Sequence, residues 1–397
     1  MNILRRFISF AGLAGSLVLA ACGGGGGGIG GTGGTMEGTL RVQLTDAPSC
    51  GYEHVYVTIT KVRVNQSSTA SDTDGGWSEV LVDAPNGRRI DLLTLQNGVL
   101  DELGETKLPA GKYTQMRLVL AESGSTAPFA NAVVLEGETD EIALDTPSAQ
   151  QSGLKLNVDL DVPADKVLDA VIDFDACKSV VKRGNSGRYN LKPVISVTPV
   201  LSDAGLRVVG YVDPAIALAT TKVSVQSAGV PVKATAPDST GQFVLYPVPV
   251  GTYDLVVTAS GRATAVMTGV PVITTAFTHV STQAVPIAPA AAASGVRAVT
   301  GTVNPATATV RALQTLTGGP TVEVQWAPVD ATSGAFAFSL PIDAPGKTTY
   351  VANPTSITFA AAAGDAGLYR IEAESAGTIK TQDIDTKNAV APLAFTF

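Results

Sequence analysis

The chain has 397 residues, of which 45% are hydrophobic and only 16% are charged. This balance excludes an intrinsically disordered chain, and the length allows two or three domains that each bury a core. The formal net charge is −8, and the chain after residue 21 is more acidic still because Arg5 and Arg6 precede it. An acidic chain lacks the basic face that phosphate backbones require, so we exclude nucleic acid as a partner.

The first 21 residues are typical of an export signal. A short basic segment with Arg5 and Arg6 precedes the apolar run 7–20, which is too short to span a bilayer comfortably. The boundary Leu-Ala-Ala-Cys, which ends at Cys22, resembles the lipobox of bacterial lipoproteins. That resemblance implies lipidation of the Cys22 sulfur and acylation of its new amine after cleavage. The alternative is an ordinary signal peptide with an incidental cysteine.

The residues after Cys22 indicate a tethered protein. In lipoproteins of this kind an aspartate after the cysteine favours retention in the inner membrane, and Gly23 stands there instead, so we expect the outer membrane. Residues 23–34 are glycine except for Ile29 and Thr32, and such a run has an r.m.s. reach of roughly 20 Å. We therefore expect a signal peptide over 1–21 and a lipidated cysteine with a Gly-rich tether over 22–36, which makes the membrane a partner.

The first folded region, residues 37–200, alternates apolar and polar side chains over several short runs. The clearest runs are 38–48, 54–64, 113–121, 154–162 and 170–177. Period-two alternation separated by turn residues predicts an antiparallel β-sandwich. The segment 88–104 is the one place where a short helix or compact loop is expected.

Several stretches of this region carry a family resemblance. They are LTDAP (44–48), VYVTITKVRV (55–64), GWSEV (76–80), IDLLTLQNG (90–98), LPAGKYTQMRLVL (108–120), TPSAQQSGLKL (146–156) and IDFDACKSVVKRGNSGRYNLKPVI (172–195). Together they resemble a bacterial domain family of unknown function, DUF4382. The family carries no established reaction, so the resemblance implies no catalytic residue.

Two cysteines remain if Cys22 is lipidated. An exported chain meets an oxidising compartment, so we predict a disulfide between Cys50 and Cys177. The alternative is two separate thiols, because the sequence does not show whether the two Cβ atoms are close enough.

Aspartates form the other visible pattern. Alternation places Asp159 and Asp161 on one face of a strand, and Asp173 and Asp175 on one face of the next. If these strands pair, four carboxylates share a surface, and Ca²⁺ would relieve their repulsion. The alternative is a solvated face without a cofactor, since the spacing matches no calcium loop. The basic run after it, residues 178–192, is able to bind an anionic headgroup or glycan, although a solvated turn is the usual interpretation.

Residues 206–285 resemble the carboxypeptidase regulatory-like, or transthyretin-like, β-sandwich. The motif residues are Asp238, Gly241 and Phe243 of a D-x-x-G-x-F turn, followed by Pro249, Gly251 and Tyr253. Residues 285–295 are interpreted as a linker. A similar turn motif occurs in DATSGAFAFSLP, so we predict a further β-sandwich over 296–397. The predicted fold class is a series of antiparallel β-sandwiches.

A glycine followed closely by a tyrosine recurs at Tyr113, Tyr253 and Tyr369. We expect each tyrosine to bury its ring and to bond nearby backbone through its hydroxyl, which is a structural role.

No catalytic motif accompanies the two histidines, His54 and His279, and we predict a protein that is not an enzyme. The sequence therefore favours an outer-membrane lipoprotein that serves interaction or envelope architecture, with a protein or glycan as ligand. The alternative is a carbohydrate- or calcium-binding module in the first domain.

Overall fold

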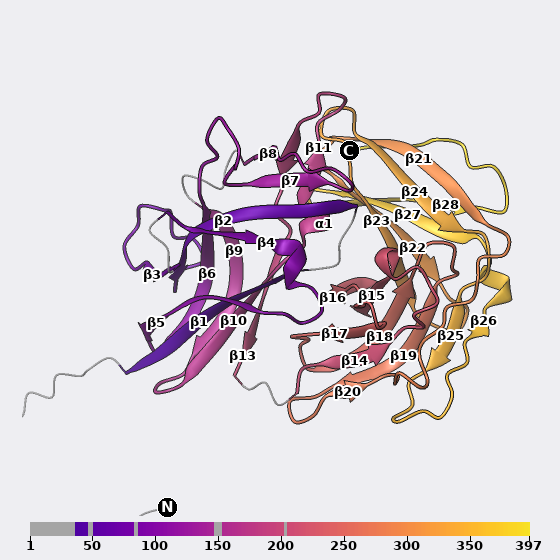
Figure 1. Cartoon of the computed structure of the whole chain (residues 1–397), viewed down its shortest axis with the longest axis horizontal. Coiled ribbons are helices and arrows are strands. Elements are labelled where there is room, and N and C mark those ends of the chain that lie inside the picture. Colours follow the sequence, from indigo (N-terminus) through magenta and orange to yellow (C-terminus); the bar gives the residue numbers. More distant parts are fainter. Residues whose placement is uncertain (1–35, 47–50, 83–85, 147–152, 202–204) are drawn as a thin grey trace, which may run out of the picture. The chain divides into compact units, whose positions relative to one another are not determined.

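The computed structural model describes residues 36–397 except 47–50, 83–85, 147–152 and 202–204, and residues 36–397 form one compact unit. The predicted signal peptide, Cys22 and Cys50 therefore lie outside the described residues. The fold is almost entirely β, as the alternation predicted (Figure 1). Within the described residues no helix is long and apolar enough to cross a membrane.

The first module contains two sheets around one core. Its strands are β1 (Glu37–Asp46), β2 (Tyr52–Asn65), β3 (Ser78–Leu81), β4 (Arg88–Asp91), β5 (Asp101–Pro109), β6 (Gly111–Leu120), β7 (Ala132–Leu135), β8 (Ile142–Asp145), β9 (Leu154–Val162), β10 (Val167–Phe174), β11 (Val180–Lys182), β12 (Tyr189–Leu191) and β13 (Ile195–Val200). One sheet has the order β13-β10-β1-β5. The other has the order β11-β12-β8-β7-β2-β6-β9, with β3 and β4 also paired to β2.

Alternation places the core of this module. Leu40, Val42 and Leu44 of β1 are fully buried, and the residues between them are only partly buried. The expected short helix in 88–104 is the 3₁₀ helix η1 (Leu92–Leu95), which follows β4. The sheets are mostly antiparallel, as expected, and β1 is an exception because it pairs with β10 in parallel. Parallel neighbours are strands distant in sequence, and alternation carries no information on direction.

The second and third modules repeat one topology. The second module has the strands β14 (Val208–Tyr211), β15 (Lys222–Ser227), β16 (Val230–Thr235), β17 (Gln242–Leu245), β18 (Gly251–Thr258), β19 (Ala265–Val272) and β20 (Thr278–His279), and the 3₁₀ helix η2 (Leu218–Thr220). The third has β21 (Val296–Asn304), β22 (Thr309–Thr315), β23 (Thr321–Ala327), β24 (Ala335–Pro341), β27 (Leu368–Ser375), β28 (Thr378–Asp385) and β29 (Leu393–Thr396). The sheet orders β17-β14-β20 and β16-β15-β18-β19 correspond to β24-β21-β29 and β23-β22-β27-β28.

A shared turn explains part of this repeat. Asp238 accepts hydrogen bonds from the backbone of its own turn, and Asp330 does the same in the third module. The glycines Gly241 and Gly334 have positive φ, and a Cβ on either would lie 2.1 Å from a backbone oxygen. Each turn therefore requires glycine. The phenylalanine two residues later is buried in both modules.

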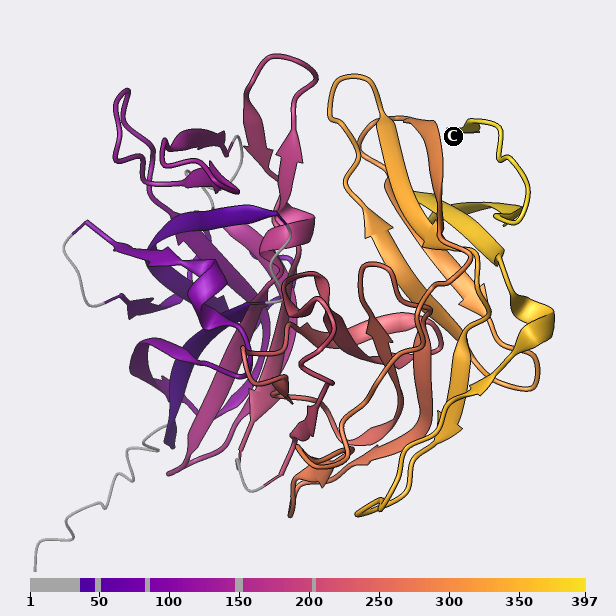
Figure 2. The same cartoon turned by 45° about the vertical axis from the view of Figure 1, so that its right-hand side comes forward.

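The third module differs from the second by an insertion. Between β24 and β27 the chain forms β25 (Gly346–Thr349), β26 (Ala360–Ala361) and the 3₁₀ helix η3 (Ala363–Asp365). β25 pairs in parallel with β19, so it extends a sheet of the second module (Figure 2). The segment 285–295, interpreted as a linker, also packs on the second module, because Ile287 is fully buried in that core.

The three repeated tyrosines are structural, as predicted. Tyr113 and Tyr253 are buried, and each hydroxyl donates to the carbonyl of the proline four residues earlier, at 3.0 and 2.8 Å. Tyr369 donates instead to the carbonyl of Pro341, at 2.7 Å. The insertion explains the difference, because it separates Tyr369 from the turn that its counterparts follow directly.

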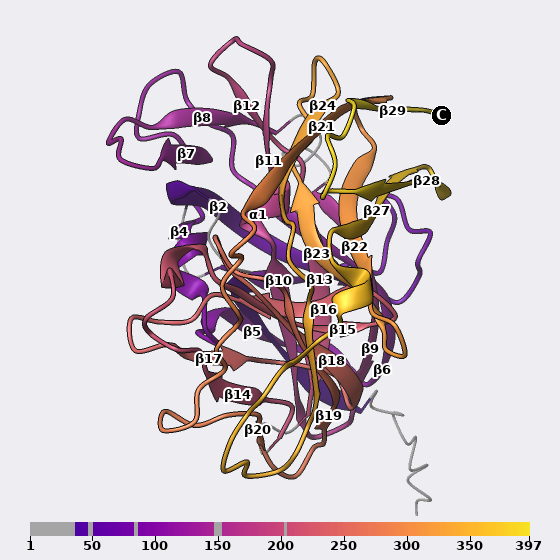
Figure 3. The ribbon, with the colours of Figure 1, turned by 90° about the vertical axis from the view of Figure 1, so that its right-hand side faces the viewer.

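Polar contacts join the modules. Asn97 accepts from the N–H of Val244 at 2.5 Å, and its own N–H donates to the Thr235 hydroxyl at 2.8 Å. The side chain of Gln226 in β15 exchanges two 2.8 Å hydrogen bonds with the backbone of Glu323 in β23. Figure 3 shows β15 and β16 beside β23. The amide of Gln226 thus satisfies the free edge of β23 as a neighbouring strand would.

Candidate binding site

A cavity of about 660 Å³ lies where the three modules meet. Its lining includes Tyr52 and Lys178 from the first module, Lys222 and Arg262 from the second, and Trp326 and Ser339 from the third. Cavities of this size, with a few polar groups among apolar ones, suit a small ligand.

Charged side chains gather beside this cavity. Lys178 lies in the short helix α1 (Ala176–Ser179). Its ammonium lies 3.4 Å from a carboxylate oxygen of Asp175 and 4.0 Å from one of Glu323. Glu323 is also 3.7 Å from the guanidinium of Arg311. Burial alone would lower the pKa of Lys178, but Asp175 and Glu323 outweigh it and raise that pKa. Lys178 therefore stays charged inside the junction.

Lys222 has a different environment. It begins β15, whose valines at 223 and 225 enter the core, so its side chain belongs to the opposite face. Among the described residues none forms a hydrogen bond or ion pair with its ammonium. Burial lowers the pKa of Lys222, and Lys178 lowers it further, while Glu323 and Asp175 act in the other direction. The cavity wall thus holds a cation without a counter-charge in contact.

The four predicted metal ligands are not brought together. β9, with Asp159 and Asp161, pairs with β6, whereas β10, with Asp173, pairs with β1 and β13 in the other sheet. The pairing that would have given one carboxylate surface does not occur. Asp175 instead caps α1 by accepting from the N–H of Lys178. Within the described residues there is no group of three or more His, Cys, Asp or Glu side chains placed to hold a metal ion.

Asp173 belongs to a buried ion pair between the first and second modules. One of its carboxylate oxygens lies 2.8 Å from the ammonium of Lys233, which is 3% exposed. The other oxygen has no hydrogen-bond partner among the described residues. Burial raises the pKa of Asp173, and the attraction of Lys233 opposes that rise. This aspartate fastens two modules together.

The basic run 178–192 is divided among several partners. Arg183 and Arg188 both pair with Asp145. Lys192 donates to the carbonyl of Thr307 at 2.5 Å, and the N–H of Gly184 donates to Asp330 at 2.6 Å. The run therefore joins the first module to the third and does not form one basic patch.

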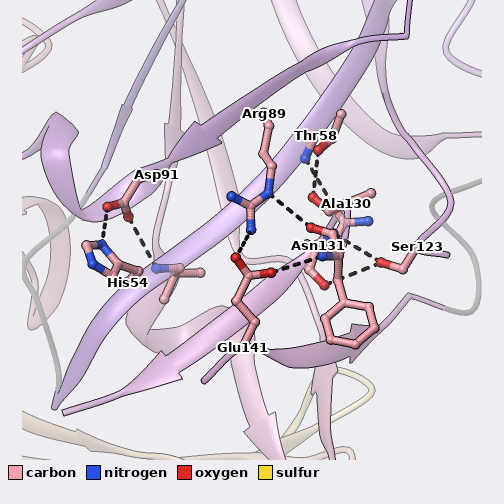
Figure 4. A network of polar contacts seen from close by, with 10 residues as sticks. His54, Thr58, Arg89, Asp91, Ser123, Ala130, Asn131 and Glu141 are labelled. Atoms are coloured by element: carbon pink, nitrogen blue, oxygen red, sulfur yellow. Dashed lines mark hydrogen bonds and ion pairs between the residues drawn. The ribbon is translucent and has the colours of Figure 1, made fainter. Parts of the chain in front are cut away.

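His54 forms a pair with Asp91, 2.6 Å between Nδ1 and a carboxylate oxygen (Figure 4). The other carboxylate oxygen accepts from the N–H groups of Val55 and Leu93. The imidazole, 41% exposed, stacks on Tyr56. Among the described residues no Ser, Thr or Cys side chain hydrogen-bonds to His54.

The rest of the network in Figure 4 is structural. Arg89 donates to Glu141 and to the carbonyl of Phe129, and Asn131 bonds the backbone of Thr58 and Ala121. These contacts connect β2 and β4 to the loop before β7. Ser123, at the far end of the view from His54, is held by Asn131.

Sequence reasoning missed Lys222, Glu323 and Trp326. Their strands carry no motif that marks a binding site. Trp326 was the signal that could have found the site, because a large ring is unusual on a solvated strand face.

The fold is one of serial β-sandwich modules, and residues of all three modules line one cavity. Residues 37–193 match the family described as "Domain of unknown function (DUF4382)", which confirms that part of the predicted resemblance. The first module is therefore a DUF4382 domain. No curated protein matches the chain.

Some solved structures show limited similarity. A cohesin–X-dockerin complex from Acetivibrio cellulolyticus, an N-terminal interface mutant, matches at 27% identity over 22% of this chain and 58% of that chain, with a TM-score of 0.19. The Bacillus anthracis TIE protein matches at 11% identity over 90% of this chain and 57% of that one, and a streptococcal ancillary pilin at 12% over 91% and 98%, both with a TM-score of 0.17. Scores this low carry no argument about function.

Proposed function

We propose that this protein is a lipid-anchored bacterial cell-envelope protein that serves binding or envelope architecture and is not an enzyme. The observation that carries the proposal is the order of the segments in the sequence. A basic start is followed by an apolar run, a lipobox that ends at Cys22 and a glycine-rich tether, and the first β-strand begins at Glu37. Several acyl chains, at about 0.8 kcal/mol per buried methylene, would hold such a protein on a membrane.

Metabolic labelling with a palmitate analogue tests the anchor. We expect label on the wild type and none on Cys22→Ser, which should also leave the membrane fraction. Cys50→Ser is the matched control, because it removes a different thiol and should keep the label. Membrane association that persists in Cys22→Ser would contradict the anchor. A second variant, Gly23→Asp, should move the labelled protein from the outer to the inner membrane fraction.

We also propose the Cys50–Cys177 disulfide. Its support is the register of β1 on β10, which sets Asp46 opposite Phe174, together with the 2.9 Å hydrogen bond from the Ala176 N–H to Asp46. Asp46, four residues before Cys50, thus lies beside Phe174 and Ala176, which precede Cys177 by three residues and one. Cys50→Ser and Cys177→Ser should each lower the unfolding free energy by about 2–5 kcal/mol, and the double variant should lose no more than either single one. Additive losses would argue for two independent thiols.

The second module, we infer, is a carboxypeptidase regulatory-like sandwich. The support is the arrangement of three and four strands, with the Asp238–Gly241–Phe243 turn between β16 and β18. This assignment concerns fold and adds no chemistry.

A further inference from the structure

The junction cavity contains polar groups that form no hydrogen bond or ion pair with any described residue. The hydroxyls of Thr258, Ser260, Thr264 and Ser339 line it, and none of them forms a hydrogen bond with a described residue. The ammonium of Lys222 likewise has no partner within the part of the chain that the structure describes. Unused donors and acceptors inside a cavity are costly unless water or a ligand satisfies them.

The charge of the lining is positive. The described lining contains three basic residues, Lys178, Lys222 and Arg262, and one acidic residue, Asp175. The Asp175 carboxylate already pairs with the ammonium of Lys178 and accepts from the Lys178 N–H. Arg262 donates to the carbonyl of Pro289 at 3.2 Å. An anionic group is therefore the ligand charge that fits beside Lys222.

Two aromatic residues also line the cavity. Trp326, in β23, lies in the lining together with Tyr52. A ring face beside several hydroxyls and a cation is suited to a molecule that carries C–H faces, hydroxyls and one carboxylate.

We propose that the cavity at the junction of the three modules binds an acidic sugar, with its carboxylate on Lys222, its hydroxyls on the threonine and serine side chains, and its ring against Trp326. This site goes beyond the proposed anchoring role and does not depend on it. Because no strand of one module supplies the whole set, the site exists only when the three modules are joined. A bound carboxylate would also counter the burial that lowers the pKa of Lys222.

Tryptophan fluorescence tests the site directly. The chain has two tryptophans, so the full-length protein with Trp77→Phe, purified in mild detergent, reports on Trp326 alone. The probe is D-glucuronate, with D-glucose, acetate and inorganic phosphate as comparisons. We expect saturable quenching by glucuronate and at least tenfold weaker responses to the three others. Equal responses to acetate or phosphate would overturn the sugar assignment, and no saturable response to glucuronate would overturn the site.

Variants locate the carboxylate. Lys222→Met should weaken glucuronate binding at least tenfold, whereas Lys155→Met, which removes an exposed lysine on β9, should not change it. The melting temperature separates binding from folding. We expect Lys222→Met to melt no lower than the parent, because it removes a cation that no described residue pairs with. Unchanged affinity in a folded Lys222→Met protein would remove Lys222 from the site.

Discussion

The sequence segments around β9 and β10 look alike, since aspartates alternate at 159 and 161 and again at 173 and 175, yet Asp159 and Asp173 lie in opposite environments. On β9 the side chain of Asp159 is 77% exposed and meets Lys112 at the surface. On β10 the side chain of Asp173 is 15% exposed and pairs with the buried Lys233 of another module. Alternation determines which residues share a face, and tertiary contacts determine what covers that face.

The largest effect should come from the buried pair. Lys233→Met leaves the carboxylate of Asp173 enclosed without its counter-charge, and we expect a loss of about 3–5 kcal/mol in the free energy of unfolding. Urea unfolding measures it. The double variant Asp173→Leu/Lys233→Met should regain most of the loss, because it removes both charges. A Lys233→Met protein as stable as the parent would contradict the conclusion that the buried pair on β10 matters more for stability than the exposed pair on β9.

The same pair should give a pH-dependent difference. Burial raises the pKa of Asp173 in the folded protein, with Asp175 adding to the rise and Lys178 opposing it. A carboxyl with a raised folded pKa contributes stability below its unfolded pKa of about 3.9 and loses it as the pH rises through the folded value. Removing Lys233 raises that pKa further, so the cost of Lys233→Met should be larger at pH 7 than at pH 4. A cost independent of pH would mean that Asp173 is not the group left unpaired.

A smaller loss should follow from Gln226→Leu. The variant removes both hydrogen bonds to the Glu323 backbone and leaves that N–H and carbonyl unpaired on a buried edge. We expect the free energy of unfolding to fall by about 2 kcal/mol. Gln382→Leu is the matched control, because Gln382 makes one bond to the Ala394 carbonyl at a more exposed site. Equal losses of unfolding free energy in the two variants would show that water can hydrogen-bond to the N–H and carbonyl of Glu323.

The smallest effect should be on β9. Lys112→Met removes the surface partner of Asp159, whose charge water already solvates, so the urea midpoint should not change measurably. A clear loss there would mean that the face of β9 is covered by something the described residues do not include.

The strands, the tyrosine turns and the DUF4382 segment were predictable because each depends on local pattern. Leu40, Val42 and Leu44 alternate into the core, and glycine is required where Gly241 turns the chain. Strand order is a long-range property, so the separation of β9 from β10 was not predictable from alternation. The junction cavity was missed for the same reason, since Lys222 and Trp326 come from modules whose contact has no local signature.

The insertion that carries β25 has a consequence for truncated forms of the protein. A chain that ends at residue 341 contains all the strands of the second module from β14 to β20, but the edge of β19 has no β25 beside it. An open edge is the part of a sheet most able to pair with another chain. The sheet of the second module is therefore complete only when Gly346–Thr349 is present, and a chain truncated before that point would leave the edge of β19 open to pairing with another chain.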